Sequence, residues 1–97
     1  MGQIQKVTPP TPEKQRVNFV LHAPEAREVC IAGSFNEWNP AARPLRCDKK
    51  GNWRTWMNLT PGQHEYRFVV NRDWQEAPDA PERQINPFGA FNSVVMV

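Results

Sequence analysis

Residues 33–39 have the sequence GSFNEWN and come directly after a strand-like run in which Val29 and Ile31 alternate with other residues. The glycine and the asparagines interrupt that alternation, and Pro40 follows them, so we expect a loop that carries Trp38. A tryptophan in such a loop either folds back over the end of the core or stays outside as a flat apolar surface. These seven residues alone do not distinguish a buried Trp38 from an exposed one.

A period of two residues, typical of strands, recurs on both sides of that loop. It predicts strands at about 17–21, 29–33, 43–47, 53–59, 64–70 and 92–97, with a hairpin loop at 48–52 and a tight turn at 60–63. Residues 75–88 are polar and rich in proline, and we expect a surface connection without strands there. The side chains expected on the inner faces are Val17, Phe19, Leu21, Trp53, Thr55, Met57, Leu59, His64, Tyr66, Phe68, Val70, Val95 and Val97.

No segment has a sustained apolar period of 3.6 residues, so the sequence predicts no helix. Short strands separated by turn signals about every eight to twelve residues indicate an all-β fold, an antiparallel β-sandwich of immunoglobulin-like type. Residues 1–15 are polar and contain three prolines, and we expect a flexible N-terminal tail there. The domain itself is expected to span residues 16–97.

The composition argues against several functional classes. The 97 residues include 39% hydrophobic and 23% charged residues, as in ordinary globular domains, and the formal net charge is only +2. Because the basic residues are few and dispersed, we expect neither nucleic-acid binding nor membrane binding. We expect no signal peptide and no membrane span, and therefore a cytoplasmic location. Cys30 and Cys47 lack the neighbours of a disulfide framework or a zinc site and are expected to act as small apolar side chains.

Catalysis has little support in the sequence. Neither His22 nor His64 lies in a nucleophile motif, and no phosphate-binding glycine loop or zinc-protease motif is present. Carboxylate pairs such as Glu25 with Glu28 lie in predicted loops, where solvated surface charge is the usual role. We therefore expect no enzyme activity and no cofactor.

A binding surface has better support. Trp38 and Trp74 each follow a strand after a turn, Arg67 points outward from the strand before Trp74, and Asn92 opens the last strand. Flat aromatic rings beside an amide and a guanidinium suit a sugar, whose C–H face covers an indole while its hydroxyls form hydrogen bonds. The same residue types also make up protein-interaction hot spots, so both ligand classes remain open at this point.

Trp53 and Trp56 lie in one predicted strand but have opposite parity. We expect Trp53 in the core and Trp56 on the outer face, with its indole over the side-chain stem of Arg54 or Arg67. The alternatives for Trp56 are an extension of the sugar-binding surface and a protein contact.

A family resemblance rests on a longer pattern of these residues. It comprises Val29-x-Ile31-x-Gly33-Ser34-Phe35-Asn36-x-Trp38, Gly51-x-Trp53, Leu59-x-Pro61-Gly62, Tyr66-Arg67-Phe68-Val69-Val70, Trp74 and Phe91-Asn92-Ser93-Val94-Val95. With this pattern the chain, from about Arg16 to Val97, closely resembles the family 48 carbohydrate-binding modules. These include the glycogen-binding domain of the AMP-activated kinase β subunit and the N-terminal domains of branching and isoamylase-type debranching enzymes.

The resemblance implies an early-set immunoglobulin-like sandwich that binds α-1,4-linked glucan, such as glycogen or starch, without catalysis. It implies that Trp38 and Trp74 stack on glucose rings, that Arg67 and Asn92 form hydrogen bonds to hydroxyls, and that Phe88 packs against the glucan. Arg67 stands where kinase-type members carry a lysine, which changes the donor geometry and keeps the charge. An alternative is a sandwich that docks to a glycan-active enzyme or a kinase subunit and has little sugar affinity of its own.

Overall fold

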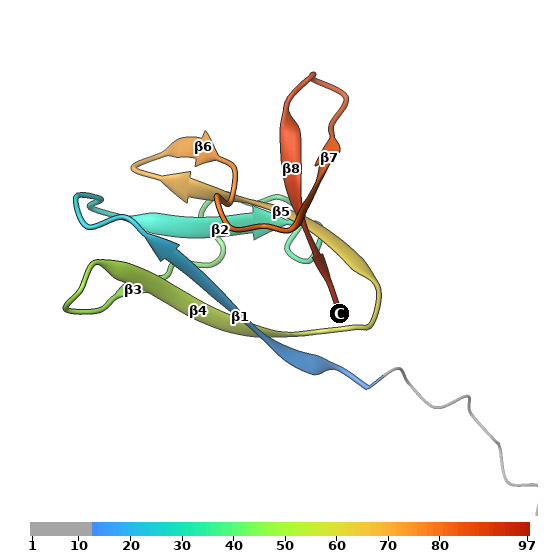
Figure 1. Ribbon diagram of the computed structural model, residues 1–97, viewed down its shortest axis with the longest axis horizontal. Coiled ribbons are helices and arrows are strands. Elements are labelled where there is room, and N and C mark those ends of the chain that lie inside the picture. The colour runs from blue at the N-terminus through green and yellow to red at the C-terminus, as the bar shows by residue number, and fades with distance from the viewer. Residues whose placement is uncertain (1–12) are drawn as a thin grey trace, which may run out of the picture.

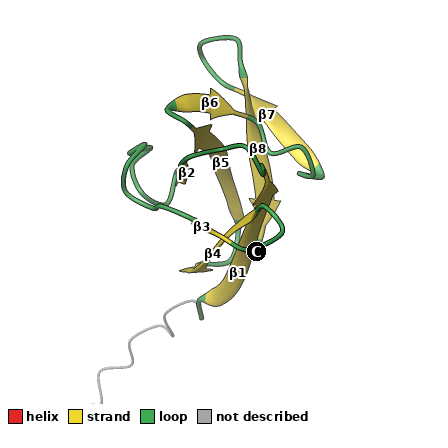
Figure 2. Cartoon of the chain, turned by 90° about the vertical axis from the view of Figure 1, so that its left-hand side faces the viewer, coloured by secondary structure: helices red, strands yellow, loops and turns green. Residues whose placement is uncertain are grey.

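The computed structural model describes residues 13–97, which form eight β-strands connected by loops and turns (Figure 1; Figure 2). The strands are β1 (Gln15–His22), β2 (Val29–Gly33), β3 (Arg46–Cys47), β4 (Asn52–Leu59), β5 (Gln63–Val70), β6 (Asp73–Gln75), β7 (Glu82–Ile85) and β8 (Phe91–Met96). Most of the predicted tail lies outside the described residues. Among residues 13–97, no helix is long and apolar enough to cross a membrane.

The strands form two antiparallel sheets. One has the order β1-β4-β3, and the other has the order β2-β5-β8-β7 with β6 beside β5. Figure 1 shows β1 and β4 running below β2 and β5, with the β7–β8 hairpin projecting above them. Residues 43–45 join the sheets on one side, where Ile31 N donates to Arg43 O (3.0 Å) and Leu45 N donates to Val29 O (2.8 Å). The result is a β-sandwich consistent with the predicted immunoglobulin-like class.

Alternate residues of both sheets meet between the layers and form the core. The buried cluster consists of Phe19, Leu21, Val29, Ile31, Leu45, Trp53, Leu59, Tyr66, Phe68 and Val70. The ring of Phe19 packs edge-on against Tyr66, with the ring centroids 5.0 Å apart. The alternation of residues in the sequence thus predicts most of these core positions. Burial, and to a smaller extent the charge of Asp79, raises the pKa of Tyr66 above its ordinary value.

Residues 75–88 contradict the expectation of a connection without strands. Gln75 ends β6, and the segment also contains the whole of β7. Every residue of β6 and β7 is exposed, so no apolar alternation marks them. They are strands because their backbones pair with those of β5 and β8. A rule that looks for one buried face cannot find such strands.

The third and last strands also differ from the predicted bounds. β3 is restricted to Arg46–Cys47, and Pro44 forms only an isolated bridge to Cys30, as expected of a residue without an amide hydrogen. Cys47, expected to act as an apolar side chain, is exposed. In β8, Val95 is partly buried against the core, as is Val97 just after it, but residues 92–94 are more deeply buried. They lie deeper because β8 is an inner strand between β5 and β7.

The two tryptophans of β4 lie on opposite faces, as predicted. Trp53 is 9% exposed, whereas Trp56 is 45% exposed on the outer face of the β1-β4-β3 sheet. The cation over Trp56 is Arg16, whose Cζ lies 4.3 Å from the ring centroid, and not Arg54 or Arg67 as expected. The reason is the strand order, which places β1 directly beside β4 with Asn18 opposite Trp56.

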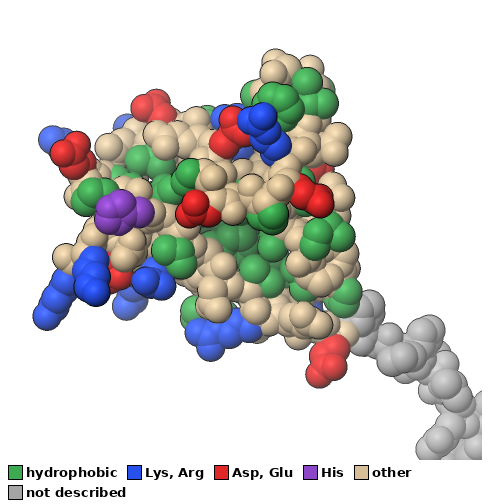
Figure 3. Space-filling view, viewed as in Figure 1, with side chains coloured by type: hydrophobic (Ala, Val, Ile, Leu, Met, Phe, Trp, Pro, Cys, Tyr) green, Lys and Arg blue, Asp and Glu red, His purple; other side chains and the backbone are tan. Residues whose placement is uncertain are grey.

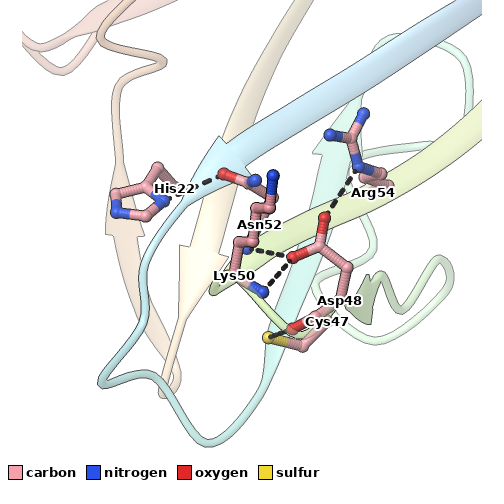
Figure 4. A network of polar contacts seen from close by, with 6 residues as sticks. All are labelled: His22, Cys47, Asp48, Lys50, Asn52 and Arg54. Carbon is pink, nitrogen blue, oxygen red and sulfur yellow. Dashed lines mark hydrogen bonds and ion pairs between the residues drawn. The ribbon is translucent and has the colours of Figure 1, made fainter.

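The β3–β4 hairpin is fixed by one carboxylate (Figure 4). Asp48 Oδ1 accepts hydrogen bonds from the backbone nitrogens of Lys50 (2.8 Å) and Asn52 (3.0 Å), and Oδ2 accepts one from Arg54 Nε (3.2 Å). The bond from the Asn52 amide, then that from the Lys50 amide, lowers the pKa of Asp48 from its ordinary 3.8 to about 2. Gly51 completes the turn with a φ of 82°.

This carboxylate gives a prediction for acid stability. Because the pKa of Asp48 is lower in the folded state, the unfolded chain takes up the proton first, so the stabilisation is complete above roughly pH 4 and is lost as the pH falls toward 2. The Asp48→Asn variant should therefore be less stable than the parent near neutral pH, and the difference should shrink as the pH falls toward 2. Urea denaturation of both proteins across this range measures it. A difference that stays constant with pH would contradict the assignment.

Candidate functional site

The end of β2 requires a glycine. A Cβ on Gly33 would lie 2.5 Å from the backbone oxygen of Glu65 and 2.7 Å from the ring of Phe35, too close for any other residue without a shift of the backbone. Ser34 N then donates to the same Glu65 oxygen (2.9 Å), so the pairing of β2 with β5 extends into the loop. This close approach fixes where the loop leaves the sheet.

Asn36 then holds the loop in shape. Its Oδ1 accepts from Gly33 N (2.9 Å) and its Nδ2 donates to Ile31 O (3.0 Å), while Trp38 N donates to Gly33 O (3.0 Å). Glu37 and Trp38 both have φ of 58°, in the left-handed region that non-glycine residues rarely adopt. The hydrogen bonds stabilise this unfavourable backbone conformation, and they thereby fix the position of Trp38.

Trp74 comes from a different part of the fold and meets Trp38. It lies in β6 opposite Val69 of β5. The two indole rings have centroids 6.5 Å apart and an angle of 44° between their planes. Trp74 is 41% exposed and Trp38 is half-buried, so neither is part of the central core. Together they form an angled aromatic wall on the outer face of the β2-β5-β8-β7 sheet.

This wall bounds a hollow of about 640 Å³, which we call the main hollow. It lies between β6 and the β7–β8 hairpin, both of which are drawn above β5 in Figure 1. Its lining residues are Trp38, Glu65, Arg67, Trp74, Gln84, Ile85, Asn86, Pro87, Phe88 and Asn92.

The polar groups of the main hollow come from neighbouring strands. Arg67 lies in β5, where its Nη2 donates to Trp74 O at 3.5 Å. Its Nε is buried and has no hydrogen-bond partner within residues 13–97. Asn92 in β8 is only 8% exposed, and its Nδ2 donates to Glu65 Oε1 (3.4 Å) while its Oδ1 accepts from Asn86 Nδ2 (3.2 Å). Asn86, Asn92 and Glu65 thus hold one another in place, whereas the side chain of Arg67 is hydrogen-bonded only to the Trp74 carbonyl among residues 13–97.

Phe88 lies in the loop of the β7–β8 hairpin and is 95% exposed. Asn86 shapes this loop, because its Oδ1 accepts hydrogen bonds from the backbone nitrogens of Phe88 (3.0 Å) and Ala90 (3.1 Å). Gly89 provides the positive φ of 82° that the turn needs. The exposed ring of Phe88 therefore lines the main hollow from an ordered loop.

The structure thus brings all five predicted site residues, Trp38, Arg67, Trp74, Phe88 and Asn92, into the lining of the main hollow. Their role in binding stays a prediction. Sequence reasoning did not select Glu65, although it shares the outward parity of Arg67 and could have been found that way. No pattern in the sequence points to Asn86, because it lies in the polar, proline-rich segment 75–88, which has no apolar alternation.

In a comparison with known protein families, residues 16–97 match the family described as the glycogen recognition site of AMP-activated protein kinase. The chain belongs to this family. The match extends from β1 to β8 and so includes every residue of the main hollow.

Curated relatives of this glycogen-recognition domain are longer proteins. The chain is 30% identical over 84 residues to the chloroplastic phosphoglucan phosphatase LSF1 of Arabidopsis thaliana, covering 84% of this chain and 14% of that protein. It is 31% identical over 80 residues to a 1,4-alpha-glucan branching enzyme of Deinococcus radiodurans, covering 82% of this chain and 11% of the enzyme. It is 30% identical over 73 residues to the 5'-AMP-activated protein kinase subunit beta-1 of Sus scrofa, covering 73% and 55%.

The histidines of this glycogen-recognition domain lie outside the main hollow. His22 Nδ1 forms a hydrogen bond with Asn52 Oδ1 (2.9 Å), and His64 Nε2 forms one with Thr60 O (2.7 Å). Among residues 13–97, no group of three or more His, Cys, Asp or Glu side chains is close enough to hold a metal ion. The main hollow presents flat apolar rings beside hydrogen-bonding groups. Such a surface is chemically suited to binding a sugar.

Proposed function

We propose that this domain binds α-1,4-linked glucan, such as glycogen, starch or maltooligosaccharides, without acting on it. The observation that carries the proposal is the angled pair of Trp38 and Trp74, 6.5 Å apart and inclined by 44°, beside Arg67 and Asn92. Family membership and the names of the relatives support the same ligand class.

The inclination of the rings favours a curved chain. Each indole offers one apolar face to the C–H face of a pyranose, and two faces at an angle fit successive sugars of a helical glucan better than those of a flat ribbon. Arg67 and the buried Asn92 line the same hollow as the two indoles, where they can reach hydroxyl groups of the sugar. Phe88, almost fully exposed in the same lining, can pack against the same chain.

The proposed absence of catalysis rests on the composition of the main hollow. Glycoside hydrolysis uses a pair of carboxyl groups on either side of the scissile bond. Within residues 13–97, Glu65 is the one carboxylate that lines this hollow, and it accepts a hydrogen bond from Asn92. A lone carboxylate held in that way suits binding a hydroxyl better than transferring a proton in a hydrolytic step.

The proposal is tested by titration with maltoheptaose or β-cyclodextrin, followed by tryptophan fluorescence or calorimetry. Because the main hollow is shallow and a flexible glucan must be ordered, we expect micromolar to millimolar affinity, about −4 to −8 kcal/mol. Cello-oligosaccharides should bind more weakly. Affinity should change little with salt, since stacking and hydrogen bonds to neutral hydroxyls dominate. Equal binding of cello-oligosaccharides, or no binding of any α-glucan at millimolar concentration, would contradict the proposal.

A second candidate function is docking to a glycan-active enzyme or a kinase subunit. It is favoured by the exposed apolar side chains of Trp56 and Val20 on the sheet opposite the main hollow, and by the greater length of the relatives. Basic side chains also gather at the β3–β4 end of the molecule, as Figure 3 shows at its lower left. An exposed indole in contact with an arginine, as Trp56 is with Arg16, is typical of a protein contact.

Trp56→Ala separates this second surface from sugar binding. Since Trp56 lies on the opposite sheet and stacks under Arg16, we expect its loss to leave maltoheptaose affinity unchanged. Titration of the variant beside the parent protein measures this. A weaker affinity in the Trp56→Ala protein would show instead that the glucan reaches around to the β1-β4-β3 sheet.

A further inference from the structure

Trp74 also lines a second hollow, of about 520 Å³, on the outer face of the same sheet. Its floor follows from strand register, because Cys30 of β2 is opposite Val69 of β5, and Val69 is opposite Trp74 of β6. These three side chains therefore form a row across the sheet. Val69 is buried although it points away from the core, because this row and the loop above it cover that part of the sheet. The floor is apolar, with one indole as its wall.

The opposite wall belongs to the loop that carries Trp38. Pro40 and Ala41 line the second hollow, and the backbone there is held by a hydrogen bond from Ala41 N to Asn39 Oδ1 (3.0 Å). One ordered loop thus contributes Trp38 to the main hollow and Pro40 with Ala41 to the second. The two hollows are neighbours that share Trp74.

Charged groups line the mouth of the second hollow. Arg72 Nε lies 3.4 Å from Glu28 Oε1, and both side chains are exposed to water. Asn71, which precedes Arg72 in the chain, binds the backbone of Glu28, because its Oδ1 accepts from Glu28 N (3.2 Å) and its N donates to Glu28 O (2.9 Å). An exposed ion pair of this kind adds little stability, so its groups can exchange partners with a ligand at small cost.

We propose that the second hollow is a further glucosyl subsite, in which the glucan chain continues past Trp74, with Arg72 and Glu28 hydrogen-bonded to its hydroxyls. This inference rests on the proposed function. Like the main hollow, the second hollow sets an indole beside hydrogen-bonding side chains, and this combination suits a pyranose. The bound glucan is then longer than the main hollow alone accommodates.

The first test compares short and long ligands. Arg72→Ala and Glu28→Ala should each weaken binding of maltoheptaose by about 3- to 10-fold, the effect of one hydrogen bond in an open site, and leave maltotriose affinity unchanged. Arg46→Ala, which removes an exposed arginine from β3 on the other sheet, is the matched control and should change neither affinity. Calorimetric titration of each protein with both oligosaccharides gives the comparison.

A second readout uses the thiol in the floor. In a Cys47→Ser background, Cys30 is the remaining cysteine. Burial raises the pKa of Cys30, so alkylation by iodoacetamide should be followed near pH 9. Saturating maltoheptaose should slow the reaction at least several-fold, whereas saturating maltotriose should have a much smaller effect.

The outcomes separate this inference from the proposed function. If maltoheptaose binds but Arg72→Ala and Glu28→Ala do not weaken it, or if it leaves Cys30 alkylation unchanged, the further subsite is wrong and glucan binding stands. If the variants weaken maltotriose and maltoheptaose equally, the two residues act on the main hollow and the subsite is again wrong. If no α-glucan binds the parent protein, both proposals fail together.

Discussion

Trp53→Ala should lower the free energy of unfolding by about 3 to 5 kcal/mol, the range for removing a large aromatic side chain from a core. Trp53 is 9% exposed, belongs to the buried cluster, and donates a hydrogen bond from Nε1 to Ala23 O (2.9 Å). The variant loses the apolar contacts of the indole, opens a cavity, and leaves a carbonyl without its donor. Urea denaturation followed by circular dichroism measures the change.

Trp56→Ala is the matched control for that experiment, because it removes the same side chain from the same strand on the opposite face. Its cost should be about 1 kcal/mol or less, since Trp56 is 45% exposed and its main partner is the Arg16 cation. If the two variants lose similar stability, the assignment of β4 faces to core and surface is wrong.

Trp74→Ala and Trp38→Ala should each weaken binding of maltoheptaose by roughly 1 to 3 kcal/mol, from the loss of apolar contact with a sugar ring. This corresponds to about a 5- to 150-fold rise in Kd. The two rings belong to one angled wall, so either loss breaks the fit to a curved chain. Calorimetric titration measures the affinity.

The fold should survive both substitutions, because neither indole belongs to the buried cluster and the loop around Trp38 is held by Asn36 and Gly33. Thermal unfolding close to that of the parent protein verifies this. An unchanged Kd in well-folded Trp38→Ala and Trp74→Ala proteins would remove the basis of the proposed function.

The sequence by itself determined the fold class and the inward residues of its longest strands. Alternation over 17–21 and 64–70 placed Phe19, Leu21, Tyr66 and Phe68 inside, where the structure has them. The opposite parity of Trp53 and Trp56 likewise gave their burial. These features are local, because every second residue of a strand lies on the same face, and a face made of apolar residues is the one that is buried.

The tertiary structure alone decided the partners of each strand and therefore the geometry of the site. The strands β6 and β7 exist through pairing with β5 and β8, and no residue within them is buried. Arg16 contacts Trp56 because β1 lies beside β4. Alternation within one strand shows which face a residue is on, but it does not show which strand is the neighbour.

The same limit applies to the main hollow. The sequence predicts loops for both Trp38 and Trp74, and the family resemblance groups them with Arg67, Phe88 and Asn92. The prediction is wrong for Trp74, which lies in β6 because its backbone pairs with that of β5. The hydrogen bonds that join Asn92 to Glu65 and Asn86, and the 44° between the indole planes, depend on how β5, β6, β7 and β8 are arranged side by side. Glu65 and Asn92 are 27 positions apart, so no local period connects them. Their contact follows from chain folding, because only pairing between distant strands brings such groups within hydrogen-bond distance.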